Sequence, residues 1–265
     1  MEVDLGNLRK PIRELRKSLK GLPSDPPMRA VHNLRTRTRR LEAISAALLP
    51  KGEPHTRRLR KVLKPLRKAA GEVRDMDVLA AKALTLAGRL GDETVEQLLE
   101  HLQTRRIESA EELVDAVDEN SKHARRRLKR FCKRVEGELQ KRNLQLRSAG
   151  KLIEELGSWP VLNADNLHDF RVRVKELRYV LQLAEDANSN FVKALDKVKG
   201  RIGTWHDWQQ LRTIAQEVLD GNQDHAAIRA ISEIERENLD DALKSAQALR
   251  RRYLSTHNGT MIAEP

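Results

Sequence analysis

The sequence predicts an all-α protein, and both composition and periodicity support this fold class. Hydrophobic residues make up 39% of the 265 residues but aromatic residues only 3%, so a core has to be built mainly from Leu, Ala, Ile and Val. Strands favour alternating β-branched and aromatic residues, which are rare here. Apolar residues recur instead at the spacing of one helical face. The two clearest stripes are Val31, Leu34, Leu41 and Leu48, and Leu167, Phe170, Val174, Leu177 and Leu181.

Turn signals rich in Gly, Pro, Asn and Asp divide the chain into eight predicted helices. The signals lie at 21–27, 50–54, 88–92, 158–166 and 220–224. The helices are expected near 4–20, 27–49, 54–89, 92–117, 119–157, 165–187, 190–219 and 225–255, followed by a flexible tail over 256–265. Pro65 should kink or split the third helix, because proline removes a backbone donor and crowds the preceding turn.

Two segments of the first half recur in the second half, in the same order. "VHNLRTRTRRLEAI" at 31–44 is echoed by "LHDFRVRVKELRYVL" at 167–181. "LRKAAGEVRDMDVL" at 66–79 is echoed by "VKGRIGTWHDWQQL" at 198–211, which aligns Gly71 with Gly203 and Asp75 with Asp207. This order predicts a duplicated four-helix unit, with residues 1–118 and 119–255 as two pseudo-symmetric four-helix bundles of one module.

Positive charge is concentrated on the repeated helices. Lys and Arg number 51 against 39 Asp and Glu, a formal charge of +12, which predicts a polyanion, an anionic surface or an acidic protein as a neighbour. Acids dominate 92–119, whereas bases dominate 29–68 and 122–134. A basic helical face is usually only solvated surface. Because the polar pattern recurs together with the apolar one, a binding role is favoured.

Helical geometry arranges these cations in stripes. At about 100° per residue, His32, Arg35 and Arg39 lie within about 60° of one another and Arg37 points away. Packed about a pseudo-twofold axis, the stripes would line one basic groove or channel. Such a row of like charges repels itself unless a multivalent anion lies there. The predicted binding residues are His32, Arg35, Arg39, Arg40, Arg57, Lys61, Lys64, Lys68, His168, Arg171, Lys175, Arg178, Lys193, Lys197 and Arg201.

These motifs resemble the CHAD family, the conserved histidine α-helical domains, over roughly 25–215. The resemblance implies two four-helix bundles, a basic central surface that binds inorganic polyphosphate, and an association with polyphosphate granules. It implies that the family's histidines correspond to His32 and His168. Three departures from the family's cation pattern predict weaker polyphosphate binding by the second half. They are Glu176 in the place of Arg40, Glu42 in the place of Arg178, and Asp196 in the place of Lys64.

The expected function is non-catalytic binding of inorganic polyphosphate. This ligand is a string of oxyanions without bases, so it requires many cations in a row and no aromatic stacking platform. Asp165 is the expected N-cap beside His168, where free backbone amides would also favour an anion. Both histidines are expected to donate to phosphate, so binding should strengthen as pH falls toward ~6. The alternative is that they only orient helices.

Two other functions remain as alternatives. The first is a general polyanion or nucleic-acid module using the basic segment 123–134, although Trp159, Trp205 and Trp208 give little stacking surface among the cations. The second is an enzyme acting on phosphate chains. No Walker loop, HExxH or nucleophile elbow occurs, and Glu233 and Glu235 would point about 200° apart on a helix.

The remaining residues indicate neither a cofactor nor a membrane span. Cys132 is the single cysteine, so it predicts a reducing compartment and a packing role. Asp75 and Asp207 are expected to be structural and to pair with a neighbouring cation, since two isolated acids are weak evidence for a metal. The start of the chain lacks a signal-peptide pattern, and no apolar run approaches ~18 residues, so a soluble cytoplasmic protein is expected.

Overall fold

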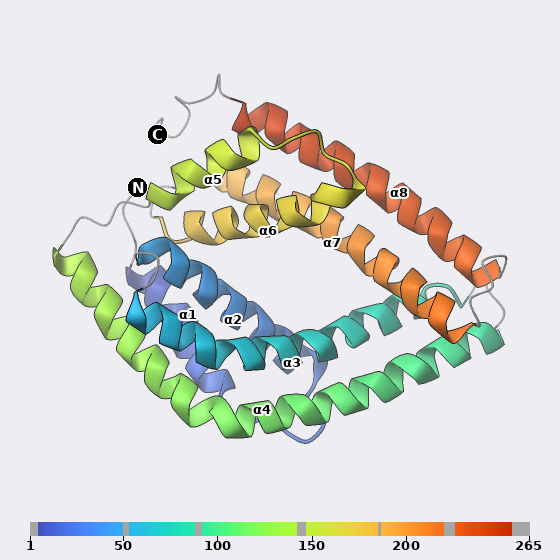
Figure 1. The fold of residues 1–265 in the computed structure, drawn as a ribbon, viewed down its shortest axis with the longest axis horizontal. Coiled ribbons are helices and arrows are strands. Elements are labelled where there is room, and N and C mark those ends of the chain that lie inside the picture. The colour runs from blue at the N-terminus through green and yellow to red at the C-terminus, as the bar shows by residue number, and fades with distance from the viewer. Residues whose placement is uncertain are drawn as a thin grey trace. The chain divides into compact units, whose positions relative to one another are not determined.

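The computed structural model describes residues 5–49, 53–87, 92–141, 147–184, 187–219 and 226–255. The regular secondary structure of these residues is helical, which confirms the predicted all-α fold (Figure 1). The chain divides between residues 145 and 146 into two compact units. We call residues 2–145 the N-terminal unit and residues 146–265 the C-terminal unit, and each is described by itself.

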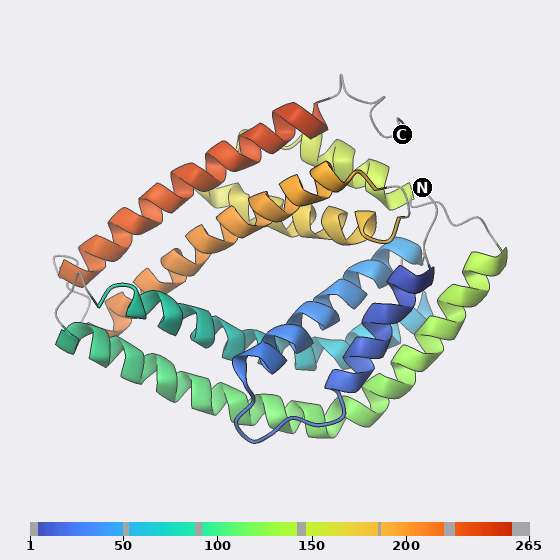
Figure 2. The ribbon, with the colours of Figure 1, turned by 180° about the vertical axis from the view of Figure 1, so that it is seen from behind.

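The described residues of the N-terminal unit form four helices. They are α1 (Leu5–Ser18), α2 (Met28–Leu48), α3 (Pro54–Leu84) and α4 (Asp92–Lys141). Helix α2 packs against α1 and α3, and α4 packs against α3 and α1 (Figures 1 and 2). Leu34 and Leu41 of α2, Leu63 and Leu66 of α3, and Phe131 of α4 are fully buried. The helix α2 stripe predicted from the sequence therefore faces the core of this unit.

The described residues of the C-terminal unit form four α-helices and a short π-helix. They are α5 (Arg147–Gly157), α6 (Ala164–Leu181), α7 (Ser189–Val218), α8 (Ala226–Leu249) and η1 (Arg250–Leu254). Helix α6 packs against α5 and α7, α7 packs against α8, and η1 contacts α5 and α8. Phe170 and Val174 of α6 are buried, as are Leu195 and Trp205 of α7. The second predicted apolar stripe thus also lies in a core.

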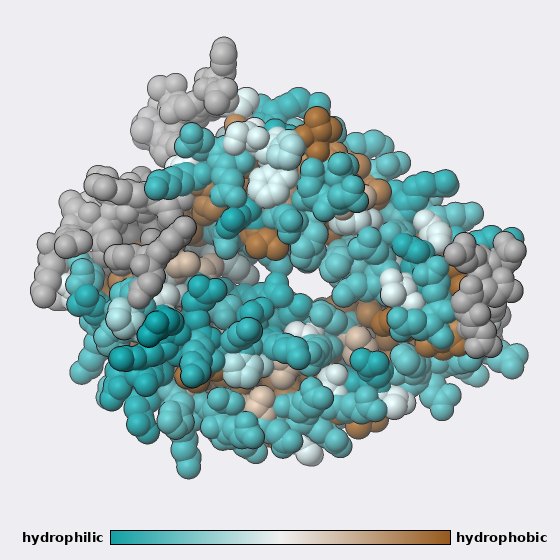
Figure 3. All heavy atoms as spheres, in the orientation of Figure 1, coloured by the Kyte–Doolittle hydropathy of each residue, from teal (hydrophilic) through white to brown (hydrophobic). Residues whose placement is uncertain are grey.

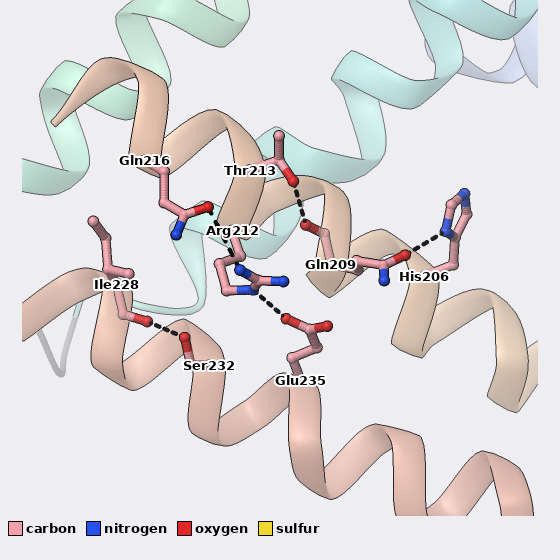
Figure 4. A network of polar contacts seen from close by, with 8 residues as sticks. All are labelled: His206, Gln209, Arg212, Thr213, Gln216, Ile228, Ser232 and Glu235. Atoms are coloured by element: carbon pink, nitrogen blue, oxygen red, sulfur yellow. Dashed lines mark hydrogen bonds and ion pairs between the residues drawn. The ribbon is translucent and has the colours of Figure 1, made fainter. Parts of the chain in front are cut away.

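A side-chain hydrogen bond joins α7 to α8, and another lies within α8. Nε of Arg212 on α7 donates to Glu235 Oε2 on α8 at 2.6 Å, and the Ser232 hydroxyl donates to the carbonyl oxygen of Ile228 within α8 (Figure 4). Hydrophilic residues cover most of the described surface on the face in Figure 3, and hydrophobic ones form small separate patches. The described surface on this face is therefore mainly polar.

The predicted helix break at 118 is wrong. Helix α4 continues through this position, and the compact units divide after residue 145 rather than between 1–118 and 119–255. Ala110, Leu113, Val117 and Ala124 are all buried, so the apolar stripe passes through the expected boundary without interruption. Residues 92–136 contain no glycine or proline. The boundary was placed at 118 so that each repeated half would have four helices, but no glycine or proline marks this position.

Two smaller predictions also differ from the structure or fall outside it. Pro65 does not split the third helix, because α3 continues on both sides of it. The side chain of Pro65 is exposed, so water can reach the backbone carbonyl that loses its helical donor there. The predicted flexible tail, 256–265, lies outside the described residues.

Candidate functional site

The predicted binding residues occupy four helices and differ in how far they reach into solvent. Nine are exposed, namely His32, Arg57, Lys61, Lys64, Lys68, His168, Lys193, Lys197 and Arg201. Six are half-buried, namely Arg35, Arg39, Arg40, Arg171, Lys175 and Arg178. The half-buried members all belong to α2 and α6, so these two helices hold their cations at the edge of a core, as expected.

The repeated glycine and aspartate of α3 form a seat for an arginine of α2. Arg35 lies over Gly71, where an added Cβ would be 3.5 Å from the arginine Nε. Its Nη1 pairs with Asp75 Oδ1 at 3.1 Å, one helical turn further along α3. The prediction that Asp75 pairs with a neighbouring cation is thus confirmed. The Gly-x-x-x-Asp pattern gives the guanidinium both room and a counter-charge.

The C-terminal unit repeats this seat with tighter geometry. Arg171 of α6 lies over Gly203 of α7, where an added Cβ would come within 2.6 Å of the arginine Nη2. Its Nε donates to the carbonyl oxygen of Lys199 at 3.2 Å. The two repeated sequence segments of each half are therefore parts of one arrangement, because the arginine of the first segment crosses the glycine of the second.

The cation two residues after each seated arginine serves a different helix. Arg37 lies 3.5 Å from Glu14 of α1, and Arg173 lies 2.7 Å from Glu155 of α5. Each pair joins the motif helix to the first helix of its own unit. Arg37 points away from the His32 stripe, as predicted. Glu176, which stands in the place of Arg40, accepts a hydrogen bond from Arg173 at 2.8 Å.

The other two departures from the repeat also have structural roles. Glu42 of α2 pairs with Arg67 of α3 at 2.9 Å, whereas Arg178 of α6 pairs with Asp196 of α7 at 3.1 Å. In the N-terminal unit the motif helix α2 supplies the acid and α3 the base, whereas in the C-terminal unit α6 supplies the base and α7 the acid. Arg178 is already engaged by a carboxylate, so its guanidinium contributes less positive charge to an incoming anion than the sequence pattern indicates.

The cations of α3 form an exposed row on the side opposite its buried leucines. Lys68 lies 3.5 Å from Glu72, an exposed pair of little energetic weight. Within the described part of the chain, Arg57, Lys61 and Lys64 form no ion pair. On a helical wheel this row lies about 60° from the side of α3 that receives Arg35. The two basic stripes therefore occupy neighbouring sides of the α2 and α3 pair.

The cations of α7 are oriented differently from those of α3. The glycine register aligns Lys64 with Asp196 and Lys68 with Gly200, so the row is not conserved at those positions. Lys197 and Arg201 instead line a cleft between α7 and α8, and Arg201 Nη1 pairs with Asp241 Oδ2 at 2.9 Å. The structure thus brings the basic stripes of α2 and α3 together but separates those of α6 and α7.

His168 contacts a second histidine that the sequence prediction missed. The ring centroids of His168 and His206 lie 4.8 Å apart in a T-shaped contact, and His206 Nδ1 lies 3.3 Å from Gln209 Oε1 (Figure 4). Partial burial lowers the pKa of His168 most, and the charges of His206, Arg171 and Lys175 lower it further, although Asp169 opposes them. The signal was present in the repeat, because His206 aligns with Arg74, another basic side chain.

The expected contribution of a helix N-terminus to His168 binding is wrong. Helix α6 begins at Ala164 and its N-cap is Asn163 rather than Asp165. The Asn163 side chain accepts from the backbone amides of Asp165 and Asn166, at 3.0 and 3.1 Å. The backbone amides of Asp165 and Asn166 therefore already have an acceptor, and His168 lies in the second turn of α6. These amides are not available to an anion at His168. Asn163 also completes a capping box with Asn166, a pairing more usual with Glu or Gln at that position.

The chain was compared with protein-family models and with curated proteins. The model described as CHAD domain matches residues 7–216. The chain belongs to the CHAD family. Binding of inorganic polyphosphate is the known property of this family, whose members are also associated with triphosphatases, so membership supports a polyphosphate-related role. None of the curated proteins matches the chain. Helices α8 and η1 lie beyond the residues that the CHAD model matches.

Three further observations concern the cysteine, possible metal ligands and the apolar character of the helices. The Cys132 thiol donates to Glu136 Oε1 at 3.3 Å, and burial raises its pKa to about 11. The thiol is therefore protonated at neutral pH, as a packing role requires. Among the described residues, no three His, Cys, Asp or Glu side chains gather where they could hold a metal ion. In the same residues, no helix has the length and apolar character needed to cross a membrane.

Proposed function

We propose that this chain binds inorganic polyphosphate without transforming it, chiefly through the basic surface of α2 and α3. The observation that carries the proposal is the row of Arg57, Lys61 and Lys64. These exposed cations have no acidic partner among the described residues and stand beside the seated Arg35. Like charges in a row repel one another, and a polyanion laid along them removes that repulsion. The CHAD motifs in the same helices support inorganic polyphosphate as that polyanion.

In the C-terminal unit, we assign polyphosphate binding to residues of α6. His168, Arg171 and Lys175 follow the same helical face as their counterparts in α2. Arginine can donate two parallel hydrogen bonds to phosphate oxygens, and lysine adds a compact charge. Arg178 and Arg201 are engaged by Asp196 and Asp241, so we assign them weaker contributions. This binding would associate the protein with polyphosphate granules in the cytoplasm.

The contacts of α8 support binding rather than catalysis. Glu233 and Glu235 are the nearest approach in this sequence to the paired glutamates of triphosphatases associated with the family. Glu235 accepts a hydrogen bond from Arg212 (Figure 4). By helical geometry, Glu233 leaves α8 about 200° away from Glu235. The two carboxylates are therefore used separately and cannot share one metal ion.

A competition experiment tests the proposed function. Labelled long-chain polyphosphate is bound to the full chain at fixed, near-physiological salt and displaced by unlabelled polyphosphate or by single-stranded RNA of equal charge. Salt has to be constant because backbone binding of either polyanion weakens steeply as ionic strength rises. We expect polyphosphate to compete at least about tenfold better, a difference of about 1.4 kcal/mol. Equal competition by RNA would replace this proposal with general polyanion binding.

The histidine contact predicts that polyphosphate binding strengthens as pH falls. The pKa of free His168 is lowered, so the imidazole is mostly neutral at pH 7. An anion stabilises the protonated form, so binding takes up a proton and raises this pKa. Affinity should therefore rise below pH 7 and level off only below the lowered pKa of the free protein. The gain is about tenfold for each unit by which the ligand raises the pKa.

The pH dependence can be assigned to His168 by substitution. Affinity is measured from pH 7.5 downward for the wild type, for His168→Gln and for His123→Gln, an exposed histidine of α4 that serves as the control. His168→Gln should make the profile shallower, leaving the contribution of His32, and His123→Gln should leave it unchanged. A wild-type profile retained in His168→Gln would mean that this histidine orients the helix without taking up a proton.

A second prediction concerns the glycine under Arg171. In Gly203→Ala the new methyl group would come within 2.6 Å of the guanidinium, so Arg171 has to move. We expect about a tenfold loss of polyphosphate affinity, since one charge-assisted contact is misplaced. Gly200→Ala on the same helix meets nothing within 4 Å and is the control. It should keep its affinity and gain about 0.5–1 kcal/mol of stability from helix propensity. Equal affinities in the two variants would remove Arg171 from the binding surface.

A further inference from the structure

A cleft in the C-terminal unit lies away from the histidine stripe. It has a volume of about 640 Å³ and runs between α7 and the segment formed by α8 and η1. The two long helices lie side by side in both ribbon views (Figures 1 and 2). This volume is typical of sites that hold small organic ligands. One wall belongs to the part of the chain matched by the CHAD model, whereas the other lies beyond residue 216.

The charges around the cleft are unbalanced in favour of cations. Lys197 and Arg201 come from α7, Lys244 from α8 and Arg252 from η1. Asp241 is the one carboxylate among the described residues that line the cleft, and it is already paired with Arg201. Lys197, Lys244 and Arg252 add positive charge around this concave surface, where a positive potential concentrates multivalent anions. The Arg252 guanidinium lies 5.3 Å from the centroid of the Tyr253 ring.

The floor of the cleft is apolar, which distinguishes it from the open cationic row of α3. Ala194 and Val198 of α7 face Ala248 and Leu249 of α8, and Val198 and Leu249 are buried. At one end, Tyr253 of the π-helix stacks on Phe191, with ring centroids 5.0 Å apart. An inorganic phosphate chain has no apolar group that could pack against these side chains. A ligand that combines phosphates with a flat organic part does.

Polar groups in the cleft match the remaining part of such a ligand. Asn190 and Ser245 can each donate or accept a hydrogen bond, and the Asp241 carboxylate can accept from sugar hydroxyl groups. The π-helix that carries Arg252 is a rare backbone geometry that often occurs at functional sites. Cations, apolar floor and hydroxyl acceptors thus lie within one cleft.

We propose that this cleft binds a nucleoside di- or triphosphate. The phosphates contact Lys197, Lys244 and Arg252, the base lies on the apolar floor, and the ribose hydroxyl groups donate to Asp241. None of the cations of α2, α3 and α6 lines this cleft. It goes beyond the proposed function because it takes a compact organic phosphate rather than a long inorganic chain.

Calorimetric titration of the full chain with ATP tests the proposal. We expect saturable binding at one site per chain and at least a tenfold loss of affinity in Lys244→Gln/Arg252→Gln, whose two side chains are exposed. Arg229→Gln/Arg236→Gln removes the same charge from exposed positions of α8 outside the cleft and should change the affinity less than twofold. Circular dichroism and thermal melting establish that each variant is folded.

Further ligands separate the phosphate contacts from those of the organic part. Adenosine should show no measurable binding, and inorganic triphosphate should bind about tenfold more weakly than ATP. The affinity of Lys244→Gln/Arg252→Gln for long-chain polyphosphate should stay within twofold of the wild type, so this site and the polyphosphate surface can fail separately. The proposal is overturned by the absence of saturable ATP binding, by equal losses in both double variants, or by equal affinity for ATP and inorganic triphosphate.

Discussion

Reversing the charges of Lys61 and Lys64 together is expected to lower the affinity for long-chain polyphosphate by about a hundredfold. Both side chains are exposed on α3 beside the seated Arg35, and neither forms an ion pair with a described residue. Each charge-assisted contact contributes about 1.5–3 kcal/mol, so losing two of them exceeds a hundredfold before repulsion by the new carboxylates is counted. The stability should change by less than about 0.5 kcal/mol, because neither side chain packs in the core.

The salt dependence gives a second measure of the same contacts. Each phosphate neutralised by a cation contributes about 0.7 to the slope of log K against log salt for a flexible single strand. Lys61→Glu/Lys64→Glu should therefore reduce the magnitude of this slope by about 1.4. Titrations of fluorescent polyphosphate at several salt concentrations measure both the affinity and the slope.

A matched variant distinguishes a defined surface from the net charge of the chain. Lys129→Glu/Arg130→Glu makes the same charge change at two exposed positions of α4, within the basic segment considered for nucleic acids. If the row on α3 is the binding surface, Lys129→Glu/Arg130→Glu should weaken polyphosphate binding by less than about threefold, because only long-range electrostatics then acts. If both double variants lose affinity equally, the row on α3 has no special role and the chain binds polyanions by overall charge.

The sequence predicted the motif helices well because their apolar spacing is regular. Val31, Leu34 and Leu41 lie in the core of one unit, and Leu167 and Phe170 lie in that of the other, as the helical period requires. The break at 118 was wrong because it came from dividing the helices equally between the two repeated halves and not from a turn signal in the sequence. The uninterrupted apolar stripe of α4 indicates a continuous helix, because helix continuity depends on packing and backbone hydrogen bonds and not on the sign of surface charge.

The candidate site was only partly predictable, because helix periodicity gives a direction but not a partner. The repeat indicated that Arg35 and Gly71 matter, but only the folded chain shows that one lies over the other. Lys197 and Arg201 had the correct spacing for a stripe, yet they face α8 rather than the arginines of α6. His206 was missed because its counterpart, Arg74, is a different residue type, and only the shared basic character links the two positions.

Removing the Arg106 side chain should strongly destabilise the N-terminal unit. This residue of α4 holds three groups at once. Its Nε lies 3.0 Å from Asp77 of α3, its Nη1 lies 2.7 Å from Asp25, and its Nη2 donates to the carbonyl oxygen of Pro26 at 2.9 Å. The Asp77 side chain is only 2% exposed. Arg106 therefore joins two helices and the segment between α1 and α2.

Arg106→Ala should lower the free energy of unfolding by about 3 kcal/mol, because it leaves the buried Asp77 carboxylate without its cation. Urea denaturation followed by circular dichroism measures this change. Arg105→Ala is the matched control, since the neighbouring Arg105 is 60% exposed and lies 3.9 Å from Glu108, a pair worth at most about 0.5 kcal/mol. Arg106→Ala/Asp77→Leu should recover part of the loss, because no buried charge then remains. Equal effects of Arg106→Ala and Arg105→Ala would mean that water, rather than Arg106, compensates Asp77.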